Sequence, residues 1–224
     1  MVPGVKLVIF GKQGAGKGTQ CQRLARHYVV PHISTGDMFR AAVKSGSEFG
    51  VKAQEFMQTG ELVPDDIVIG LVSERLSDLD TRGRGFILDG FPRTAQQAEA
   101  LAEHLAPDEI DLAIDLEVPT EVVLRRLAGR RVCQDCGTNY GPDNPPKEDD
   151  ICDVCGGEVI QRRDDTEAAI RRRLELYEKE TEPLIAWYLS RDQLVTVDGM
   201  GTPDQVTARL IRAVDTRREH RHAR

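Results

Sequence analysis

The sequence predicts an α/β fold in which a parallel sheet of about five strands is covered by helices on both faces. Short runs rich in Val, Ile and Leu alternate with stretches of helical character along the 224 residues. The runs are apolar at consecutive positions, which is typical of strands buried on both faces of a parallel sheet. The composition agrees, because 40% of the residues are hydrophobic and 30% are charged, the profile of a globular domain.

The elements follow in order along the chain. Strands are predicted at 5–10, 29–33, 85–89, 112–118 and 194–197. Helices are predicted at 18–28, at 37–60 with a break at Ser45-Gly46, at 65–79, from Pro119, at 168–190 with a kink at Pro183, and from Pro203. The basic, polar tail from Thr216 to Arg224 is expected to be frayed.

Two stretches depart from the alternation of strands and helices. Residues 34–63 are helical without a strand, and residues 129–165 carry four cysteines with Gly and Pro but no helical period. We read both as insertions into a core domain. The core is then formed by residues 1–33, 64–128 and 166–224.

The segment from Gly11 to Thr19 follows a predicted strand, precedes a helix and matches G-x-x-x-x-G-K. Small residues let backbone N–H groups surround a phosphate, and the next helix points its positive dipole end at the same anion. Lys17 can then reach the outer phosphates. The pattern predicts a bound nucleoside triphosphate. Gly18 stands where most such loops have a magnesium-ligating hydroxyl, so that direct ligand is in doubt here.

Positive charge is concentrated locally, although the net charge is −7. The net negative charge argues against electrostatic binding of nucleic acid by the protein surface as a whole. Nine arginines lie within 49 residues: Arg125, Arg126, Arg130, Arg131, Arg162, Arg163, Arg171, Arg172 and Arg173. A solvated helix face with ion pairs is one interpretation. The use of arginine rather than lysine favours phosphate, because its planar fork binds oxyanions with two hydrogen bonds.

Three further polar segments lie at or after predicted strands. They are residues 34–40, residues 89–94 with Gln97, and Asp164-Asp165 followed by residues 171–173. Ligands of open α/β sheets bind beyond the carboxyl ends of the strands. We therefore expect these segments to converge on the phosphate loop. Arg40 and Arg93 suggest a second phosphorylated ligand.

With these motifs the sequence resembles the adenylate kinase family, from about Val5 to Leu210. The resemblance rests on residues 14–19 (GAGKGT), 34–37 (STGD), 89–93 (DGFPR), 129–131 (GRR) and 162–165 (RRDD). The cysteine-bearing insertion is similar to the long, zinc-containing lid found in part of that family. The resemblance implies a P-loop nucleoside monophosphate kinase fold with a helical NMP-binding insertion. It also implies reversible phosphoryl transfer from MgATP to AMP, giving two ADP.

The resemblance further implies roles at the matching positions. ATP would contact Gly14, Ala15, Gly16, Lys17, Gly18, Thr19, Arg126, Arg130, Asn139, Tyr140 and Gly201. AMP would contact Thr35, Arg40, Glu61, Leu62, Val63, Gly90, Phe91, Pro92, Arg93, Gln97, Arg162 and Arg173. Phosphoryl transfer would depend on Lys17, Arg93, Arg130, Arg162 and Arg173. Asp37 and Asp89 would order water around Mg²⁺.

The choice of acceptor base is a finer prediction. Thr35 can hydrogen-bond an adenine edge, and the related UMP/CMP kinases usually carry alanine there with a short lid. Gln97 can also pair with adenine, so AMP is favoured over pyrimidine acceptors. Two departures from the family pattern, Gln13 in place of a frequent proline and the charged Glu61, are not expected to change the reaction.

Cys133-x-x-Cys136 and Cys152-x-x-Cys155 are separated by fifteen residues. Two such knuckles form a tetrahedral thiolate site, most often for zinc. Iron or another divalent metal, two disulfides and four free thiols are the alternatives. With all four positions filled by protein, the metal would fold the lid rather than take part in chemistry. Cys21 is interpreted as a small core or surface residue, and histidines such as His32 show no metal-binding spacing.

The sequence has no apolar run of about 18 residues and no signal-peptide pattern. We expect a cytoplasmic protein, a monomer, that acts on the small molecules ATP and AMP and has no nucleic-acid or membrane partner. Two other functions remain open at this point. One is a nucleic-acid-binding module built on the cysteine knuckles, and the other is a P-loop switch that hydrolyses ATP to move a partner.

Overall fold

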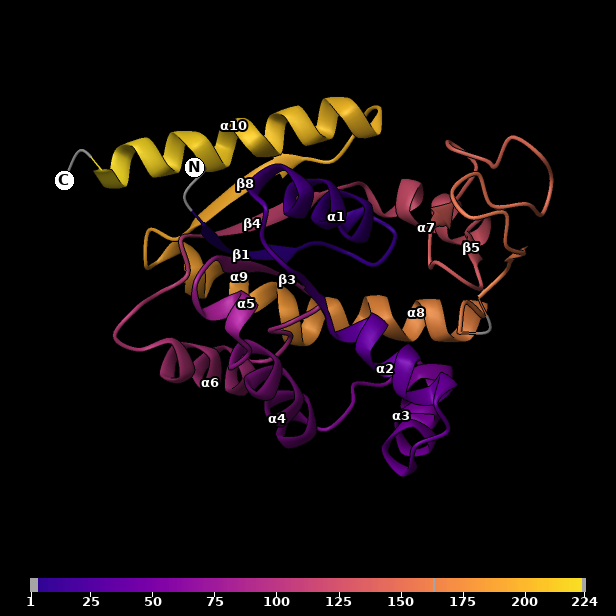
Figure 1. The fold of residues 1–224 in the computed structure, drawn as a ribbon, viewed down its shortest axis with the longest axis horizontal. Coiled ribbons are helices and arrows are strands. Elements are labelled where there is room, and N and C mark those ends of the chain that lie inside the picture. Colours follow the sequence, from indigo (N-terminus) through magenta and orange to yellow (C-terminus); the bar gives the residue numbers. More distant parts are fainter. Residues whose placement is uncertain (1–3, 163, 223–224) are drawn as a thin grey trace.

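A computed structural model describes residues 4–162 and 164–222, and it has a parallel sheet at its centre (Figure 1). Within the described residues this sheet has five strands in the order β2-β3-β1-β4-β8. The strands are β1 (Val5–Phe10), β2 (His32–Ser34), β3 (Gly85–Asp89), β4 (Leu112–Glu117) and β8 (Leu194–Asp198). The predicted fold class is confirmed.

Helices cover both faces of the sheet (Figure 1). The side chains of β1 alternate between two hydrophobic clusters: Leu7 and Ile9 pack in one, and Val8 and Phe10 pack in the other. The first cluster includes residues of α1 (Lys17–Tyr28), α7 (Thr120–Ala128) and α10 (Pro203–His222). The second includes residues of α4 (Asp65–Leu76), α6 (Ala95–Leu105) and α9 (Glu182–Leu189). Strands buried on both sides explain the continuous apolar runs of the sequence.

The strand order brings the candidate site together. β1 lies between β3 and β4, while the chain runs from β1 to β2 across β3. Register pairs Ile9 with Asp89 and Ser34 with Asp89. The loops that follow β1, β2 and β3 therefore leave the same edge of the sheet side by side, where ligands of such sheets bind.

The two predicted insertions lie at one end of the molecule (Figure 1). The first contains α2 (Thr35–Lys44) and α3 (Glu48–Thr59), which pack on each other. Hydroxyl groups of Ser34 and Ser47 accept hydrogen bonds from backbone N–H groups and cap these two helices. The second carries an antiparallel three-stranded sheet of β5 (Arg131–Cys133), β6 (Asn139–Tyr140) and β7 (Val159–Ile160), which was not predicted. The domain boundaries themselves stay predictions.

Several elements differ from the prediction. Strand β2 begins at His32 rather than Val29, because Val29 has a left-handed backbone (φ 57°) and ends α1. The stretch 168–190 is α8 (Glu167–Leu176), a π-helical turn (Tyr177–Thr181) and α9, so the break lies just before Pro183. Helix α6 was not predicted, and a short helix α5 (Leu79–Arg82) follows α4.

The expectation of a frayed tail is wrong for residues 216–222, because α10 continues to His222. Arg217 anchors this turn through an ion pair with Asp192 at 2.9 Å. Ala223 and Arg224, the other part of the predicted tail, lie outside the described residues. No helix in the described part of the chain has the length and apolar character needed to span a membrane.

Candidate active site

A cavity of about 410 Å³ opens at the carboxyl edge of the parallel sheet. Its wall is formed by the phosphate loop, both insertions, the segment after β3, and α8. With the exception of Phe91, every residue predicted to bind a nucleotide, or to order water around Mg²⁺, lines this cavity. The Phe91 side chain packs in the core cluster with α4 and α6 instead, with 3% of its surface exposed.

The phosphate loop needs glycine where its backbone turns. Gly14 has φ 86°, and a Cβ atom there would lie 2.8 Å from Leu127 Cγ on α7. A larger residue would therefore push the loop away from α7. Lys17 closes the loop from the other side, since its Nζ donates hydrogen bonds to the carbonyl oxygens of Gly11 at 2.6 Å and Lys12 at 3.0 Å. Burial lowers the pKa of Lys17, and the nearby Asp89 carboxylate opposes this only in part.

Asp89 ends β3 directly opposite the start of α1. Burial raises the pKa of this carboxyl, but the neighbouring His32 and the charges of Lys17 and Arg93 outweigh burial and hold it below its usual value. A Cβ atom on Gly18 would lie 3.6 Å from Asp89 Oδ2. A methyl group at Gly18 would make ordinary van der Waals contact with Asp89, so the missing side chain leaves space for about one small group beside an ionised carboxylate.

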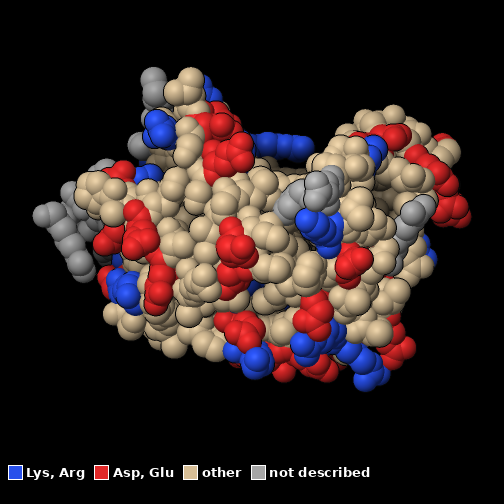
Figure 2. Space-filling view, turned by 90° about the horizontal axis from the view of Figure 1, so that it is seen from below, with Lys and Arg blue, Asp and Glu red and all other residues tan. Residues whose placement is uncertain are grey.

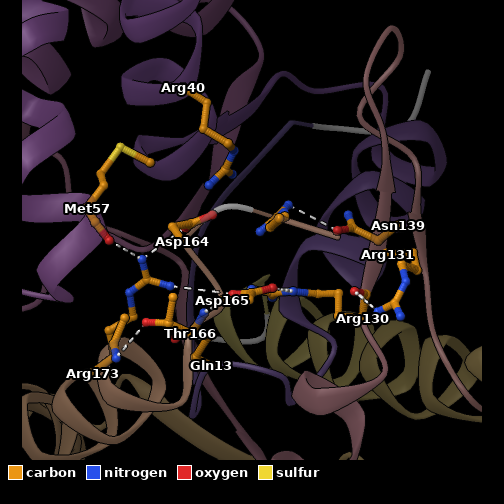
Figure 3. A network of polar contacts seen from close by, with 12 residues as sticks. Gln13, Arg40, Met57, Arg130, Arg131, Asn139, Asp164, Asp165, Thr166 and Arg173 are labelled. Carbon is orange, nitrogen blue, oxygen red and sulfur yellow. Dashed lines mark hydrogen bonds and ion pairs between the residues drawn. The ribbon is translucent and has the colours of Figure 1, made fainter. Parts of the chain in front are cut away.

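Asp165 lies between two of the predicted phosphate-binding arginines (Figure 3). Its carboxylate accepts two hydrogen bonds from Arg130, one of them from Nε at 2.7 Å, and lies 3.7 Å from Arg173 Nη1. The Asp165 side chain is fully buried. Arg173 also donates to the Met57 carbonyl at 2.6 Å and to Asp164 at 2.9 Å. These contacts hold both guanidinium groups at the cavity wall.

Gln13 joins the same network, although sequence reasoning assigned it no role (Figure 3). With its amide oxygen turned toward the arginines, Gln13 accepts hydrogen bonds from Arg130 Nη2 at 2.9 Å and Arg173 Nη1 at 2.8 Å. The partners are more than 100 residues away in sequence, so no local pattern could have revealed them. Gln13 therefore connects the phosphate loop to both arginines.

The other cations of the cavity are buried against one another. Burial and the charges of Arg130 and Arg40 lower the pKa of Arg162 to about 10. Burial also lowers the pKa of Arg93, where the charges of Arg173 and Arg40 add to the effect and Asp89 opposes it. The Nε atom of Arg162 is buried without a hydrogen-bond partner. Buried cations that repel each other and retain a free donor fit a site for an anion.

The acceptor side is held by hydrogen bonds around Gly90. Thr35 donates to the Gly90 carbonyl at 2.9 Å, and Arg93 Nε donates to the same oxygen at 2.9 Å. Gln97 is almost fully buried, with its Nε2 bound to Asp65 at 2.7 Å and its oxygen accepting from the Arg93 N–H at 2.8 Å. Asp65, which the sequence did not single out, thus orients Gln97 at the cavity wall.

Glu61 lies at the mouth of the acceptor side and forms an ion pair with Arg172 at 2.7 Å. The hydrogen bond from Arg172 lowers the pKa of Glu61. Both side chains are exposed. The negative charge at Glu61 is therefore paired at the surface.

Arg126, on α7 of the core, and Arg162, in the lid, both line the lid side of the cavity. Arg126 Nη1 donates to the Ala15 carbonyl of the phosphate loop at 3.3 Å. Arg162 donates to Asn139 Oδ1 at 3.0 Å. Tyr140 also faces the cavity, but its hydroxyl donates to Cys152 Sγ at 3.3 Å and accepts from the Asp153 N–H at 2.8 Å. Tyr140 therefore links the cavity wall to the cysteine group.

The four lid cysteines come together as the knuckle spacing predicts. The sulfur atoms of Cys133, Cys136, Cys152 and Cys155 all lie within 4.8 Å of one another. All four are free thiols, so the alternative of two disulfides is not what the structure has. Gly137 and Gly156 turn the chain with φ 72° and 74°, and backbone N–H groups approach the sulfurs. Four converging sulfurs fit a tetrahedral metal such as zinc.

Fold and site together define a class of protein. A phosphate loop and a second set of buried arginines face each other across one cavity, which suits a P-loop kinase that brings two phosphorylated nucleotides together.

Comparisons with known proteins identify the family. Residues 9–193 match the family model described as adenylate kinase. The chain is 48% identical to the adenylate kinase of Clostridium novyi over 205 residues, which is 90% of this chain and 94% of the relative. It is 49% identical to that of Methanosarcina barkeri over 207 residues, with the same coverage. The adenylate kinase of Methanocella arvoryzae is 47% identical over 94% of this chain and 98% of its own. The chain belongs to the adenylate kinase family.

Proposed function

We propose that this chain transfers the terminal phosphoryl group of MgATP to AMP, reversibly, to give two ADP. The observation that carries the proposal is one cavity with a phosphate loop on one side, an arginine-lined pocket on the other, and Arg162 and Arg173 in its wall. Two anions held in line, with their charge neutralised, are most of what phosphoryl transfer needs from a protein.

The donor half holds ATP by its phosphates. The backbone N–H groups of residues 14–19 and the start of α1 receive them, and Lys17 leaves its two carbonyl partners to contact the outer phosphates. Arg126 from the end of α7 and Arg130 from the start of the lid reach the same phosphates. Asn139, Tyr140 and the Gly201 backbone border the nucleoside. The position of these residues around the cavity supports this assignment.

The acceptor half holds AMP between the α2–α3 insertion and the segment after β3. Arg40 and Arg93 bind its phosphate, while Thr35 and the backbone of residues 61–63 and 90–92 surround the nucleoside. Gln97 reads the adenine edge, held in place by Asp65. The attacking AMP oxygen is already ionised at neutral pH, so the mechanism needs no strong general base.

Arginines carry the charge stabilisation. Arg130, Arg162 and Arg173 neutralise the charge that spreads over the transferring group, together with Arg93 and Lys17. The buried, mutually repelling cations support this, because phosphate replaces the missing counter-charge. In the free protein, hydrogen bonds to Asp165 and Gln13 hold the guanidinium groups of Arg130 and Arg173 at the cavity wall.

The residues fit magnesium bound through water. Asp89 is an ionised carboxylate on the cavity wall, oxygen donors are what Mg²⁺ prefers, and Gly18 leaves room for water beside it. Asp37 faces the same cavity. When bound with ATP, Mg²⁺ would neutralise phosphate charge. Asp89 and Asp37 would orient its water ligands.

The four lid cysteines fit structural Zn²⁺, since four sulfurs converge and leave no position for substrate. The lid and the α2–α3 insertion are the parts we propose to close over the nucleotides, excluding water that would compete with AMP. The length of the lid and its four cysteines correspond to the long-lid, zinc-containing type of the family.

We also propose that the protein works in the cytoplasm as a monomer, on small-molecule nucleotides. Charged side chains of both signs are interspersed over the face seen in Figure 2, which has no continuous basic area. This distribution and the net charge of −7 argue against nucleic acid as a partner.

An acceptor panel tests the proposal. With MgATP as donor, AMP, GMP, CMP and UMP are compared by the ADP formed. We expect AMP to exceed each other acceptor by at least about 100-fold, the discrimination that buried hydrogen-bonding groups commonly provide. Equal loss of ATP with and without AMP would instead indicate an ATPase. CMP or UMP as the best acceptor would contradict the assignment of Thr35 and Gln97.

A further inference from the structure

A second group of metal-ligating side chains lies behind the cavity wall, between α1 and the parallel sheet. Cys21 comes from α1, His32 from the start of β2 and Asp89 from the end of β3. One ligand atom of each lies within 4.8 Å of those of the other two. Sequence reasoning gave Cys21 and His32 no role because 11 and 57 residues separate His32 from the other two.

The nitrogen at the centre of this group has no hydrogen-bond partner. His32 Nε2 is buried, makes no hydrogen bond within 3.5 Å, and has Asp89 Oδ2 at an ion-pair distance of 3.6 Å. Only 13% and 14% of the two side chains are exposed. Cys21 is completely buried and its thiol is free. A buried polar atom with only this long contact is poorly satisfied, and a cation shared by the imidazole and the carboxylate would satisfy both.

The donor set and its spacing match a borderline-soft cation. Zinc binds sulfur, imidazole nitrogen and carboxylate oxygen at about 2.0–2.3 Å, which puts tetrahedral ligand atoms roughly 3.3–3.8 Å apart. The distance of 3.6 Å between His32 Nε2 and Asp89 Oδ2 falls in that range. Mg²⁺ prefers an all-oxygen set and does not suit the thiol and imidazole.

We propose that Cys21, His32 and Asp89 form a second metal site, separate from the lid cysteines, for a thiophilic divalent cation such as Zn²⁺ or Cd²⁺. Asp89 lines the cavity, whereas Cys21 and His32 lie behind it. Gly18 and Asp89 both line the cavity, so a cation reaches the site from that side. Cys21 binds as thiolate and its proton passes to solvent. The fourth coordination position faces the cavity and takes water, as in zinc sites with three protein ligands.

The neighbouring charges determine how strong the site is. Lys17 and Arg93 repel a cation at Asp89, and burial, with the charge of Asp89, raises the pKa of the Cys21 thiol well above its usual value, which opposes formation of the thiolate. We therefore expect weaker binding than at the four lid cysteines. A cation held here engages the Asp89 carboxylate and withdraws it from the magnesium water, so it inhibits phosphoryl transfer. The inhibition rests on the proposed role of Asp89, whereas the binding does not.

Metal binding is tested directly on the full chain with zinc in the lid. Wild type, Cys21→Ala, His32→Gln and the exposed control His104→Gln are dialysed against buffered Cd²⁺. Total zinc plus cadmium per chain and the thiolate-to-cadmium charge-transfer absorption are then measured. Wild type and His104→Gln are expected to take up one more cation than Cys21→Ala. His32→Gln is expected to bind it about tenfold or more weakly.

The same total metal content in wild type and Cys21→Ala, with both variants folded by thermal melting, would overturn the site. The inhibitory effect is measured separately, as the rate with saturating MgATP and AMP at buffered free Zn²⁺. Cys21→Ala should keep the basal rate and resist Zn²⁺ at concentrations that inhibit wild type. A second bound cation that leaves the wild-type rate unchanged would overturn the inhibition and leave the binding site standing.

Discussion

The phosphate loop lies between β1 and α1, which both pack into a large hydrophobic cluster, whereas the lid has a cluster of only four buried residues. Two of those four, Cys133 and Cys152, belong to the cysteine group itself. Burial of apolar surface therefore stabilises the loop, while the lid would depend on the metal that we propose its four cysteines bind. Both regions present cations to one cavity, but their stability should respond to different changes.

The largest effect, a loss of catalytic rate, is expected from a substitution in the phosphate loop. Replacement of Lys17 by Met removes a buried charge aimed at the transferring phosphates and should lower kcat about 100- to 1,000-fold. The melting temperature should hardly change, because the hydrophobic clusters around the loop stay intact. Lys44→Met, an exposed lysine at the end of α2, serves as the matched control in steady-state assays. A Lys17→Met variant with a near-native rate would remove this residue from the mechanism.

Removal of the lid metal, unlike Lys17→Met, should lower the stability of the protein. Cys133→Ser, or chelation of the metal, is expected to unfold the lid locally and leave the parallel sheet folded. Hydrogen exchange should then lose protection in β5, β6 and β7 while β1, β3 and β4 remain protected. The melting temperature should fall by several degrees, and kcat/KM for ATP by about tenfold or more, because Arg130 would no longer be positioned by Asp165. Unchanged protection in the lid after chelation would show that its fold does not need metal.

The smallest effect is expected where the two regions meet, at Gln13. Gln13→Leu keeps the approximate size but removes the acceptor shared by Arg130 and Arg173. Loss of hydrogen bonds of about 1 kcal/mol corresponds to roughly a fivefold rise in the KM for ATP. Gln96→Leu on the exposed face of α6 is the matched control. If Gln13→Leu and Gln96→Leu have the same KM, Gln13 does not position the arginines.

Much of the core could be predicted because its signals are local. Consecutive apolar residues identify β1, β3 and β4, and glycine spacing identifies the phosphate loop. The start of strand β2 was predicted too early, at Val29, because Val29 is apolar. Its left-handed backbone ends α1 instead. The lid strands have two or three residues each and are organised by the cysteine knuckles, so they carry no periodicity.

The site residues also divide into those with a local sequence signal and those without one. Lys17, Arg93 and the four lid cysteines stand in motifs whose chemistry can be read from adjacent positions. Gln13, Asp65 and His32 could not be assigned, because their partners lie on other elements and come close only when the chain folds. Tyr140 was predicted to contact ATP and lines the cavity, but nothing in the sequence indicated that its hydroxyl hydrogen-bonds with Cys152 and Asp153.

The buried cations around Arg93 and Arg162 have a consequence for the lifetime of the protein. Without phosphate they repel each other, so the free chain carries an electrostatic cost that bound nucleotide removes. A ligand that binds only the folded state stabilises it by mass action. Proteolysis should therefore slow as nucleotide concentration rises, and starvation for nucleotides would expose the enzyme to degradation when it has least substrate to convert.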